Sequence, residues 1–529
     1  MSEEPTQKAA LDYLTALAAE QSGDTSPVRV DTHANIVLLA GDTAYKVKRA
    51  VKFPFLDYST PEKRAEACRR EITHNINNAP QIYREAVPIV RAANGTLSLG
   101  GKGDPVEWVV IMNRFDQSLQ LDQIAAKGPL SNELCDALAT MLARAHENAP
   151  RHPDASQGFV DELASYVDQN EAAFAEHPDL FPPDEALRLT RQSRNALDRI
   201  RSLILNRGAH GHIRLCHGDA HLRNIVLLDG EPVLFDAIEF SDAMATTDTL
   251  YDLAFLIMDL WERGQRPAAN RIFNRYLDKQ AEPERMAQLN EDALCALPFY
   301  LMMRAAIRAK IAASAARTQQ NERQRQEQED QARAYFAQAQ AFLDPDEPAL
   351  LAIGGLSGTG KTTLAHALAH RIGRAPGARI LRTDVERKKR LGIPETAKAP
   401  PEAYTREASD AVYEILERKI AATLAAGHSA IFDAVFAGEA DREKISDVAS
   451  SAEARFCGLW LEAPETVLKD RVSARQADAS DATPAVIDLQ LGYELGKMAW
   501  RRVDAGGDAA STREHAETAL GDLIATGKD

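Results

Sequence analysis

The sequence predicts a chain of two domains, a mixed α+β domain followed by a three-layer α/β domain built on a parallel sheet. The chain has 529 residues, more than one hydrophobic core usually organises. A proline-containing break at 344–348 interrupts its pattern of helices and strands. Directly after the break, residues 349–372 are predicted to form an apolar strand, a glycine-rich loop and a helix, the first unit of a parallel α/β sheet. We therefore place the domains at 1–343 and 346–529.

Composition and charge narrow the class of protein. Apolar residues make up 45% of the chain and charged residues 26%, as in an ordinary soluble globular protein. The formal net charge of −16 argues against a broad surface for nucleic acid, so we do not expect nucleic acid as a partner. No apolar run approaches the roughly 18 residues that span a membrane, and the N-terminus lacks the apolar core of a signal peptide.

The pattern of cysteines indicates the cellular compartment in which the protein works. They are Cys68, Cys135, Cys216, Cys295 and Cys457. They are scattered, with no close pair and no metal-type spacing, which favours free thiols in a reducing cytoplasm. We therefore expect a cytoplasmic protein without a membrane partner, and the sequence leaves its oligomeric state open.

The first elements of the chain place two lysines on a predicted strand. Residues 6–22 have the apolar spacing of an amphipathic helix, and β-rich runs at 33–39 and 44–48 follow, separated by a Gly-Asp turn. Lys46 and Lys48 share one face of the second strand because side chains alternate with a period of two. Sequence alone does not separate them, and a solvated strand lysine is the alternative for either one.

A helix is predicted to begin at 59–62 and to run to about Asn75. Its start has a hydroxyl N-cap, a proline at the first position and an early glutamate. Glu71 on this helix is a candidate partner for a strand lysine. Arg69 and Arg70 lie beside it in the sequence, so a plain surface ion pair is the alternative.

The next segments predict more strands and then helices. The strands are expected at 88–90, 96–99 and 108–112, and the helices at 130–148, 158–177 and 184–206. Residues 113–116 follow the last strand as a candidate hinge between two lobes. The sequence of this part has no Gly-x-Gly-x-x-Gly loop, so phosphate would need cover from another backbone turn. We consider 31–35 for this role, and the sequence leaves the assignment open.

The segment 216–240 carries the strongest chemical pattern of the first domain. Asp219 is followed five residues later by Asn224, and two β-rich runs around an Asp-Gly pair predict a hairpin that ends at Asp236. Carboxylate and amide oxygens are the hard ligands that magnesium prefers. An Asp, an Asn five residues on and a second Asp after a hairpin form the catalytic and metal constellation of protein-kinase-like phosphotransferases. In that constellation Asp219 accepts the proton of the acceptor hydroxyl, and Asn224 and Asp236 hold magnesium on the nucleotide phosphates.

The signature His217-Gly218-Asp219, with Asn224 and Asp236, resembles the aminoglycoside phosphotransferase family. Protein kinases carry Arg where Gly218 stands. The resemblance implies a protein-kinase-like two-lobed fold, ATP and Mg2+ as cofactors, and a small-molecule hydroxyl acceptor. It also implies that Lys46, fixed by Glu71, binds the nucleotide phosphates.

Two details refine the resemblance. Many relatives follow the second Asp with an aromatic residue and a Glu, whereas Ala237, Ile238 and Glu239 follow Asp236 here, so local packing is expected to differ. The stretch 51–58 and the helix after it resemble a subgroup of phosphotransferases fused to a second kinase.

Helices are predicted to fill the rest of the first domain, at 248–262, 266–280, 284–314 and 320–343. The last of them is rich in Gln, Arg and Glu, and we expect it to join the two domains. Arg304, Arg308 and Lys310 are candidates to bind an anionic acceptor, with a solvated helix face as the alternative.

A phosphate-binding loop opens the second domain. Residues 355–362 match Gly-x4-Gly-Lys-Thr, and the loop lies between a predicted strand and a predicted helix, as this motif requires. Lys361 is expected to reach the outer phosphates, and the Thr362 hydroxyl to ligate magnesium. The residues expected to contact nucleotide are Gly355, Ser357, Gly358, Thr359, Gly360, Lys361, Thr362 and Thr363.

Two aspartates follow later strands of the predicted parallel sheet. Asp384 comes after a strand at 378–381, and Asp433 ends the strand 430–433. Ligands of parallel sheets bind at the carboxyl ends of the strands. We assign Asp384 to the acceptor hydroxyl, and Asp433 either to magnesium or to the acceptor.

Two arginines lie after the strand 456–461. Arg471 and Arg475 resemble the arginine-bearing lid of small P-loop kinases, which closes over ATP and stabilises the transition state. A plain helix-face arginine is the alternative for each. The domain as a whole resembles P-loop kinases that phosphorylate small molecules or nucleic-acid ends, such as gluconate kinase, chloramphenicol phosphotransferase and polynucleotide kinase.

The sequence thus predicts a bifunctional phosphotransferase with two ATP and Mg2+ sites, each transferring the γ-phosphate to a hydroxyl of a small molecule. One alternative is a regulatory ATP-binding protein, in which one kinase-like domain senses nucleotide and controls the other. The missing glycine loop favours this alternative, and the intact Asp219, Asn224 and Asp236 disfavour it. A further alternative is a nucleic-acid end kinase, which the basic cluster 387–390 supports and the net charge weakens.

Overall fold

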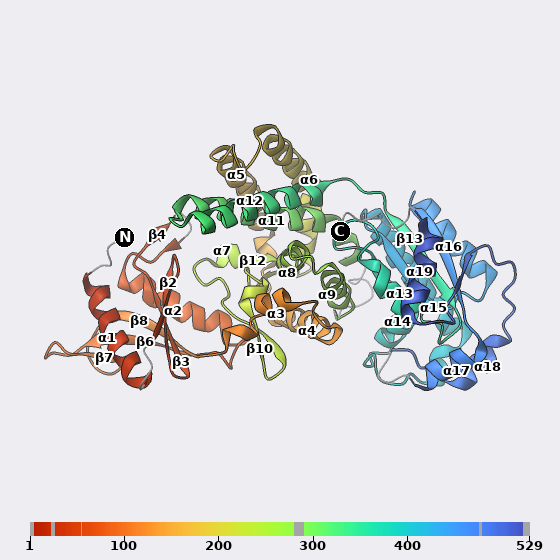
Figure 1. Cartoon of the computed structure of the whole chain (residues 1–529), viewed down its shortest axis with the longest axis horizontal. Helices are drawn as coiled ribbons and strands as arrows, with labels where there is room; N and C mark the ends of the chain where they lie inside the picture. Colours follow the sequence, from red (N-terminus) through yellow and green to blue (C-terminus); the bar gives the residue numbers. More distant parts are fainter. Residues whose placement is uncertain (1–4, 23–26, 54–55, 280–289, 475–478, 522–529) are drawn as a thin grey trace. The chain divides into compact units, whose positions relative to one another are not determined.

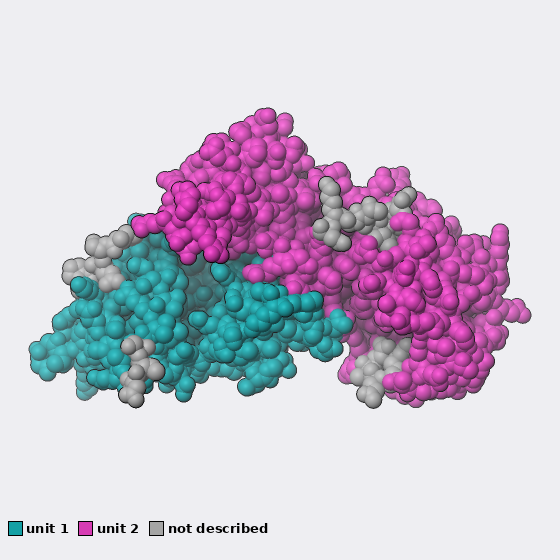
Figure 2. Space-filling model, in the orientation of Figure 1, with its two compact units in different colours: residues 1–165, 201–259 teal, residues 166–200, 260–529 magenta. Residues whose placement is uncertain are grey.

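The computed structural model describes residues 5–22, 27–53, 56–279, 290–474 and 479–521. The chain divides into two compact units, which Figure 2 distinguishes by colour. Unit 1 consists of residues 1–165 and 201–259, and unit 2 of residues 166–200 and 260–529. The domain boundary at 343–346 stays a prediction from the sequence. Within the described ranges, each helix is too short or too polar to span a membrane.

Unit 1 begins with a six-stranded antiparallel sheet. Its strands lie in the order β1 (Val28–Asp31), β2 (Asn35–Ala40), β3 (Thr43–Lys48), β8 (Asp104–Asn113), β6 (Tyr83–Arg91) and β7 (Leu97–Leu99). Apolar residues of helix α1 (Pro5–Ser22) form one buried cluster with the sheet, and helix α2 (Pro61–Asn75) contributes to a second cluster (Figure 1). These two clusters hold β3 and α2, which carry the candidate phosphate-binding groups, in fixed register.

Helix α2 begins as predicted. The Thr60 side chain accepts a hydrogen bond from the backbone N–H of Lys63 at 3.4 Å, and Pro61 occupies the first helical position. Glu71 and Asn75 lie on its buried face.

The segment 216–240 contains the predicted hairpin. Strand β10 (Ile225–Leu228) pairs with β11 (Glu231–Leu234) in antiparallel register. The turn residues Asp229 and Gly230 have φ of +51° and +85°, the left-handed values that a two-residue hairpin turn requires. Strand β9 (Ile213–Leu215), which pairs with β12 (Thr246–Asp248), leads into the loop before the hairpin. Helices α3 (Leu121–Lys127) and α4 (Asn132–Asn148) belong to unit 1, as does α8 (Thr249–Glu262) up to Asp259.

Unit 2 contains a helical part and a parallel sheet. The helices are α9 (Arg266–Lys279), α11 (Leu297–Thr318) and α12 (Glu322–Leu343), with residues of α5 (Ser156–Ala175) and α6 (Pro183–Ala209). Phe336 of α12 packs against Phe174 and Phe181, with ring centroids 5.2 and 5.1 Å away. Helix α12 corresponds to the predicted polar connecting helix, whereas the predicted helix start at 284 lies outside the described residues.

The second half of unit 2 confirms the predicted three-layer α/β domain. Its five parallel strands lie in the order β14 (Arg379–Arg382), β15 (Ala430–Asp433), β13 (Ala349–Gly355), β16 (Arg455–Glu462) and β17 (Arg501–Asp504). One buried cluster joins the sheet to α13 (Lys361–Ala369) and α19 (Ala509–Leu520), and another joins it to α15 (Arg406–Ala425) and α16 (Glu439–Ser451) (Figure 1). The phosphate-binding loop therefore connects the central strand to its following helix.

Helix α9 completes the edge of this sheet. Strand β14 is an edge strand, and the Asn274 side chain donates to Ala378 O at 3.1 Å and accepts from Ile380 N at 2.7 Å. Buried Arg379 forms ion pairs with Asp278 at 2.8 Å and with Glu291 at 3.2 Å. Backbone groups at the edge of the parallel sheet are thus satisfied by a side chain of α9, which lies outside the sheet.

Candidate active sites

In unit 1, two lysines of β3 share one glutamate of α2. Lys46 Nζ lies 2.7 Å from Glu71 Oε1, and Lys48 Nζ lies 2.6 Å from Glu71 Oε2. The Glu71 side chain is fully buried, so it is not part of a surface ion pair. Burial alone would raise the pKa of Glu71, but the two lysines lower it to about 2, which keeps the carboxylate charged.

The two lysines differ in their second partner. Lys46 Nζ contacts Asp236 Oδ1 at 2.5 Å, and the Asp236 side chain is 41% exposed. Lys48 is fully buried and pairs with Glu239, which also accepts from the Tyr58 hydroxyl at 2.5 Å. Burial alone would lower the pKa of Lys46, but Asp236 and Glu71 hold it well above its usual value. Lys46 is therefore buried next to the exposed Asp236, and Lys48 is fully enclosed.

Glu239 has a structural role at the point where the residues after Asp236 differ from the pattern of many relatives. The residue lies three positions after Asp236 and reaches the enclosed lysine of β3. A buried ammonium without a partner would be costly, and Glu239 supplies a second carboxylate for Lys48. Glu71 is thereby shared between the lysine beside Asp236 and the enclosed one.

The loop before the hairpin brings Asp219 and Asn224 together. Asn224 Nδ2 donates to Asp219 Oδ2 at 2.8 Å and to Asp219 O at 3.0 Å. Because the amide nitrogen is engaged in this way, the amide oxygen is the atom of Asn224 that can ligate a metal. His221 Nε2 lies 3.3 Å from Asp219 Oδ2, whose side chain is 38% exposed. Asp219 is thus oriented by two side chains of its own loop.

Asp236 has a strained backbone. Its φ is +64°, a left-handed value that costs a non-glycine residue about 1–3 kcal/mol. Its N–H donates to the Tyr83 hydroxyl at 3.1 Å, and the N–H of Ala237 donates to Asn75 Oδ1 at 2.9 Å. These contacts from β6 and α2 maintain the backbone that aims Asp236 at Lys46.

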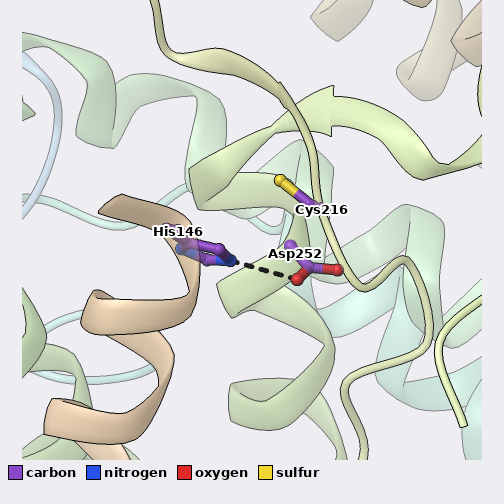
Figure 3. Close-up of side chains that lie close together, drawn as sticks. All are labelled: His146, Cys216 and Asp252. Atoms are coloured by element: carbon purple, nitrogen blue, oxygen red, sulfur yellow. Dashed lines mark hydrogen bonds and ion pairs between the residues drawn. The ribbon is translucent and has the colours of Figure 1, made fainter. Parts of the chain in front are cut away.

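Helix α8 anchors the loop that carries Asp219. Asp252 Oδ1 accepts from Gly218 N at 2.8 Å, and Asp252 Oδ2 lies 3.0 Å from His146 Nε2 (Figure 3). Gly218 has a φ of +81°, a left-handed value that favours glycine, and an added Cβ would lie 2.9 Å from Ile238 Cδ1, so the Ile238 side chain would have to shift to admit a larger residue.

The same cluster offers a histidine, a thiol and a carboxylate to a metal. Ligand atoms of His146, Cys216 and Asp252 lie within 4.8 Å of one another (Figure 3). Both Asp252 oxygens already have partners, however, and burial raises the pKa of the Cys216 thiol well above its usual value. Because the thiolate is the form that binds metal, these three residues are better described as an anchor for the loop.

The turn proposed to cover phosphate connects β1 and β2. Thr32 Oγ1 accepts from Asn35 N at 2.9 Å, and Thr32 N donates to Asn35 O at 2.9 Å. In the sheet Asn35 pairs with Lys48, and Val37 pairs with Lys46. The turn lies at the end of the strand next to the lysine strand, and its residues include no glycine.

In unit 2, three glycines shape the phosphate-binding loop. Gly355, Gly358 and Gly360 have φ of +140°, +87° and +88°. A Cβ added at Gly358 would lie 2.8 Å from Leu468 O, and one at Gly355 would lie 2.7 Å from Leu461 O. The loop conformation therefore depends on residues without side chains.

The residues after the loop meet the carboxyl end of β15. Thr362 Oγ1 donates to Asp433 Oδ2 at 2.5 Å, and Lys361 Nζ donates to Leu356 O at 3.1 Å. Asp433 also lies 3.5 Å from Arg382 Nε. A hydroxyl and a carboxylate in contact at the loop provide hard oxygen ligands of the kind that magnesium takes.

Comparisons with known proteins assign these two parts to families. Residues 41–289 match the model of a phosphotransferase enzyme family, and residues 350–493 match the model of an AAA domain. The chain thus joins a part that matches phosphotransferase enzymes to a part that matches AAA domains and contains the phosphate-binding loop. It is therefore an enzyme, a phosphotransferase of the kinase type.

Some similar proteins match nearly the whole chain, and others match only a part of it. A protein of Mycobacterium tuberculosis described as uncharacterized is 29% identical over 486 residues, which cover 90% of this chain and 92% of that protein. A gluconokinase from Sinorhizobium meliloti 1021 is 20% identical, with 34% of this chain and 94% of that chain covered and a TM-score of 0.26. A choline/ethanolamine kinase family protein from Mesorhizobium loti is 14% identical, with 64% and 99% covered and a TM-score of 0.36.

A cavity of about 530 Å³ adjoins the loop of the P-loop kinase domain. It is lined by Gly358, Thr359, Gly360, Thr363, Leu364, Ala367, Arg471, Asp508, Ala509, Ala510, Thr512 and Arg513. Arg471 donates to Ala505 O at 2.8 Å and to Gly358 O at 3.4 Å. Arg471 thus connects the loop to the wall of the cavity, whereas Arg475 lies outside the described residues.

The structure places Asp384 in the first turn of α14 (Thr383–Arg390), where Arg387 Nη1 lies 3.0 Å from Asp384 Oδ1. Lys388 and Lys389 of the basic cluster also have internal partners. Lys388 pairs with Asp481 at 3.0 Å, and Lys389 donates to Asp278 O at 3.5 Å. Of the four basic residues 387–390, all of them described, only Arg390 is exposed. The cluster of the phosphotransferase is therefore not a charged surface.

Several residues of the kinase-type sites were not predicted from the sequence. His221 stands two positions after Asp219 in the same loop, a signal that was available. Glu239 lies close to Asp236 in the same way. Asp252 and His146 come from distant helices, so their contact with the loop has no local sequence signal.

Proposed function

We propose that the chain is a bifunctional phosphotransferase that uses ATP and Mg2+ at two separate sites and transfers the γ-phosphate to hydroxyl groups of small molecules. One observation supports the proposal: in each unit a group expected to bind phosphate or metal contacts an aspartate. Lys46 Nζ lies 2.5 Å from Asp236 in unit 1, and Thr362 Oγ1 lies 2.5 Å from Asp433 in unit 2. Both pairs belong to the families' kinase patterns.

In the first site the residues have separate roles. Lys46, held by Glu71, binds phosphate oxygens, and the oxygens of Asn224 and Asp236 are the metal ligands. Asp219 accepts the proton of the acceptor hydroxyl, and its half-exposed carboxylate is accessible for this. Magnesium with ATP supplies charge neutralisation and the transferable phosphoryl group.

In the second site the loop binds phosphate through its backbone. The N–H groups from Gly358 to Thr363 and the ammonium of Lys361 bind the phosphates, and the cavity beside Arg471 takes the nucleoside. The contact with Thr362 supports the metal role of Asp433 over its acceptor role. Asp384 is the proposed acceptor-facing carboxylate, and Arg471 with Arg475 the proposed lid.

The acceptors we propose are small molecules that carry a hydroxyl group, in the cytoplasm. Arg387 and Lys388 of the basic cluster of α14 form ion pairs inside unit 2, and this counts against a nucleic-acid end kinase. The domains at 1–343 and 346–529 remain part of the proposal. Because a fragment that begins at 346 lacks α9 and would uncover Ala378 O and Ile380 N, the experiments below use the full chain.

A regulatory ATP-binding protein is the second candidate. The turn that connects β1 and β2 has no glycine, and this observation favours a first site that binds nucleotide without transferring phosphate. In such a protein, nucleotide bound to unit 1 would control turnover by the P-loop domain.

The test uses ATP consumption against a panel of metabolites and aminoglycosides. The parent, Lys361→Ala, Asp219→Asn and the double variant are compared at equal concentration. The proposal expects two sets of acceptors, one lost with Lys361→Ala and the other with Asp219→Asn. Loss of all turnover with Lys361→Ala alone would instead support the regulatory candidate.

A further inference from the structure

A glutamine of α18 (Pro484–Leu491) contacts the phosphate-binding loop. Gln490 Oε1 accepts a hydrogen bond from the N–H of Ser357 at 2.8 Å, and Gln490 is only 7% exposed. Its neighbours Leu489 and Leu491 are 65% and 45% exposed, so Gln490 is the inward residue of this helical end. The contact is therefore specific to one side chain.

Apolar packing fixes α18 against the same loop. Leu468 and Val472 of α17 (Glu465–Ser473) and Ile487 of α18 form a buried cluster, and Leu356 of the loop packs against it. The loop residue next to Ser357 is thus held by the helices that carry Arg471 and Gln490. Gln490 is therefore held against the loop by the packing of its own helix.

The position of Ser357 along the loop indicates which phosphate it faces. Lys361 Nζ rests on Leu356 O at 3.1 Å, and the lysine of this motif reaches the outer phosphates. Among the described loop residues, Gly358, Thr359 and Gly360 line the cavity proposed for the nucleoside, and Ser357 does not. Ser357 and Gln490 therefore lie at the γ-phosphate end of the loop.

We propose that Gln490 is a positioning residue for the γ-phosphate in the second site, an inference that rests on the proposed function. Its Oε1 holds Ser357, and its Nε2 has no hydrogen-bond partner among the described residues. Phosphoryl oxygens are strong acceptors, so the amide group offers the donor that this end of the loop needs. In the transfer, the acceptor oxygen bonds to the γ-phosphorus as the bond to the bridging oxygen of ADP breaks, and Gln490 exchanges no proton.

A carboxylate at this position gives the sharpest test. Gln490→Glu retains an acceptor for Ser357 but replaces the donor with a negative charge beside the γ-phosphate. The background is the full chain with Asp236→Asn, which weakens Mg2+-dependent nucleotide binding in unit 1. Titrations with ATP and with ADP, both with Mg2+, are compared for Gln490→Glu, Gln490→Ala and the exposed control Leu489→Ala.

We expect Gln490→Glu to weaken ATP binding on the order of tenfold or more, because hydrogen bonds to charged groups are worth about that much. ADP binding should change less than about twofold. Gln490→Ala should lower ATP binding by a smaller factor, and Leu489→Ala should match the parent. Equal losses for ATP and ADP would show that Gln490 only maintains the loop, and unchanged ATP binding would also overturn the proposal.

Two controls separate this inference from the proposed function. Lys361→Ala must abolish binding of both nucleotides to unit 2, and its failure to do so would remove the site itself. If Lys361→Ala still binds nucleotide in unit 2, the proposed function is contradicted. If Lys361→Ala loses binding but the Gln490 variants keep the parent's ratio of ATP affinity to ADP affinity, only the role of Gln490 is contradicted. If Gln490→Glu has a lowered melting temperature, the ratio of ATP affinity to ADP affinity measured for Gln490→Ala decides whether Gln490 positions the γ-phosphate.

Discussion

The two proposed phosphate sites are built from different parts of the chain. Unit 1 uses side chains from three elements, with Lys46 on β3, Glu71 on α2 and Asp236 after the hairpin. Unit 2 uses consecutive backbone groups of one loop, with φ values at Gly358 and Gly360 that favour glycine. A site of the first kind depends on buried charge pairs, and a site of the second kind depends on backbone conformation. The two sites should therefore fail under different substitutions.

The largest expected effect concerns the catalytic loop of unit 1. In the full chain with Lys361→Ala, Asp219→Asn should reduce phosphoryl transfer by a factor on the order of 10²–10⁴ with ATP binding nearly intact, because a positioned base contributes that much. Asp236→Asn removes a metal ligand and should weaken Mg2+-dependent ATP binding itself. Transfer rates and binding isotherms measured on the same preparations check this. Two variants with the same phenotype would contradict the separate roles.

Removal of the shared glutamate should destabilise unit 1 alone. Glu71→Gln leaves two buried lysines with one carboxylate each, and breaking a buried pair costs about 3 kcal/mol. Hydrogen exchange should show this loss at β3 and α2, with protection at β13 unchanged. The control is Glu66→Gln on the same helix, whose side chain is 63% exposed and whose loss should cost less than about 0.5 kcal/mol.

A single methyl group should damage the backbone-built site. Gly358→Ala forces a left-handed residue, at a cost of about 1–2 kcal/mol, and brings Cβ to 2.8 Å from Leu468 O. Nucleotide affinity of unit 2 should fall roughly fivefold to thirtyfold from this cost alone. Gly158→Ala, where an added Cβ meets nothing within 4 Å, is the matched control and should bind like the parent. Equal affinity in Gly358→Ala would show that the loop tolerates another conformation.

The smallest expected effect is a pH dependence of unit 1. The pKa of Glu71 is lowered from 4.5 to about 2, so its contribution to stability is present above pH 4.5 and is lost as the pH falls toward 2. Between pH 5 and about 3.5 the parent should lose on the order of 1 kcal/mol more than Glu71→Gln. Urea unfolding of the β3 region at both values measures the difference. An equal loss of unfolding free energy in the parent and in Glu71→Gln would contradict the role of this carboxylate.

The comparison also explains what the sequence could predict. The phosphate-binding loop, its strand and its helix are contiguous, so a local pattern contains the whole structural unit. The hairpin between Asn224 and Asp236 was predictable for the same reason, because Asp229 and Gly230 suit its turn. Both domain folds followed from such local units.

The side-chain site of unit 1 was only partly predictable. Lys46 and Lys48 share a strand face, and only the tertiary contacts with Asp236 and Glu239 distinguish them. The anchor of the catalytic loop at Asp252 depends on a helix that is distant in sequence. The support that α9 gives to β14 could not be predicted either, because the pairing of Asn274 with an edge strand has no local pattern.

The central claim is that the chain contains two independent nucleotide sites, and binding stoichiometry tests it most directly. A non-hydrolysable ATP analogue with Mg2+ is titrated calorimetrically into the full chain, Lys361→Ala, Asp236→Asn and the double variant. We expect two equivalents for the parent, one strong equivalent for each single variant and none for the double variant. A parent that binds one equivalent, lost with Lys361→Ala and unaffected by Asp236→Asn, would contradict it.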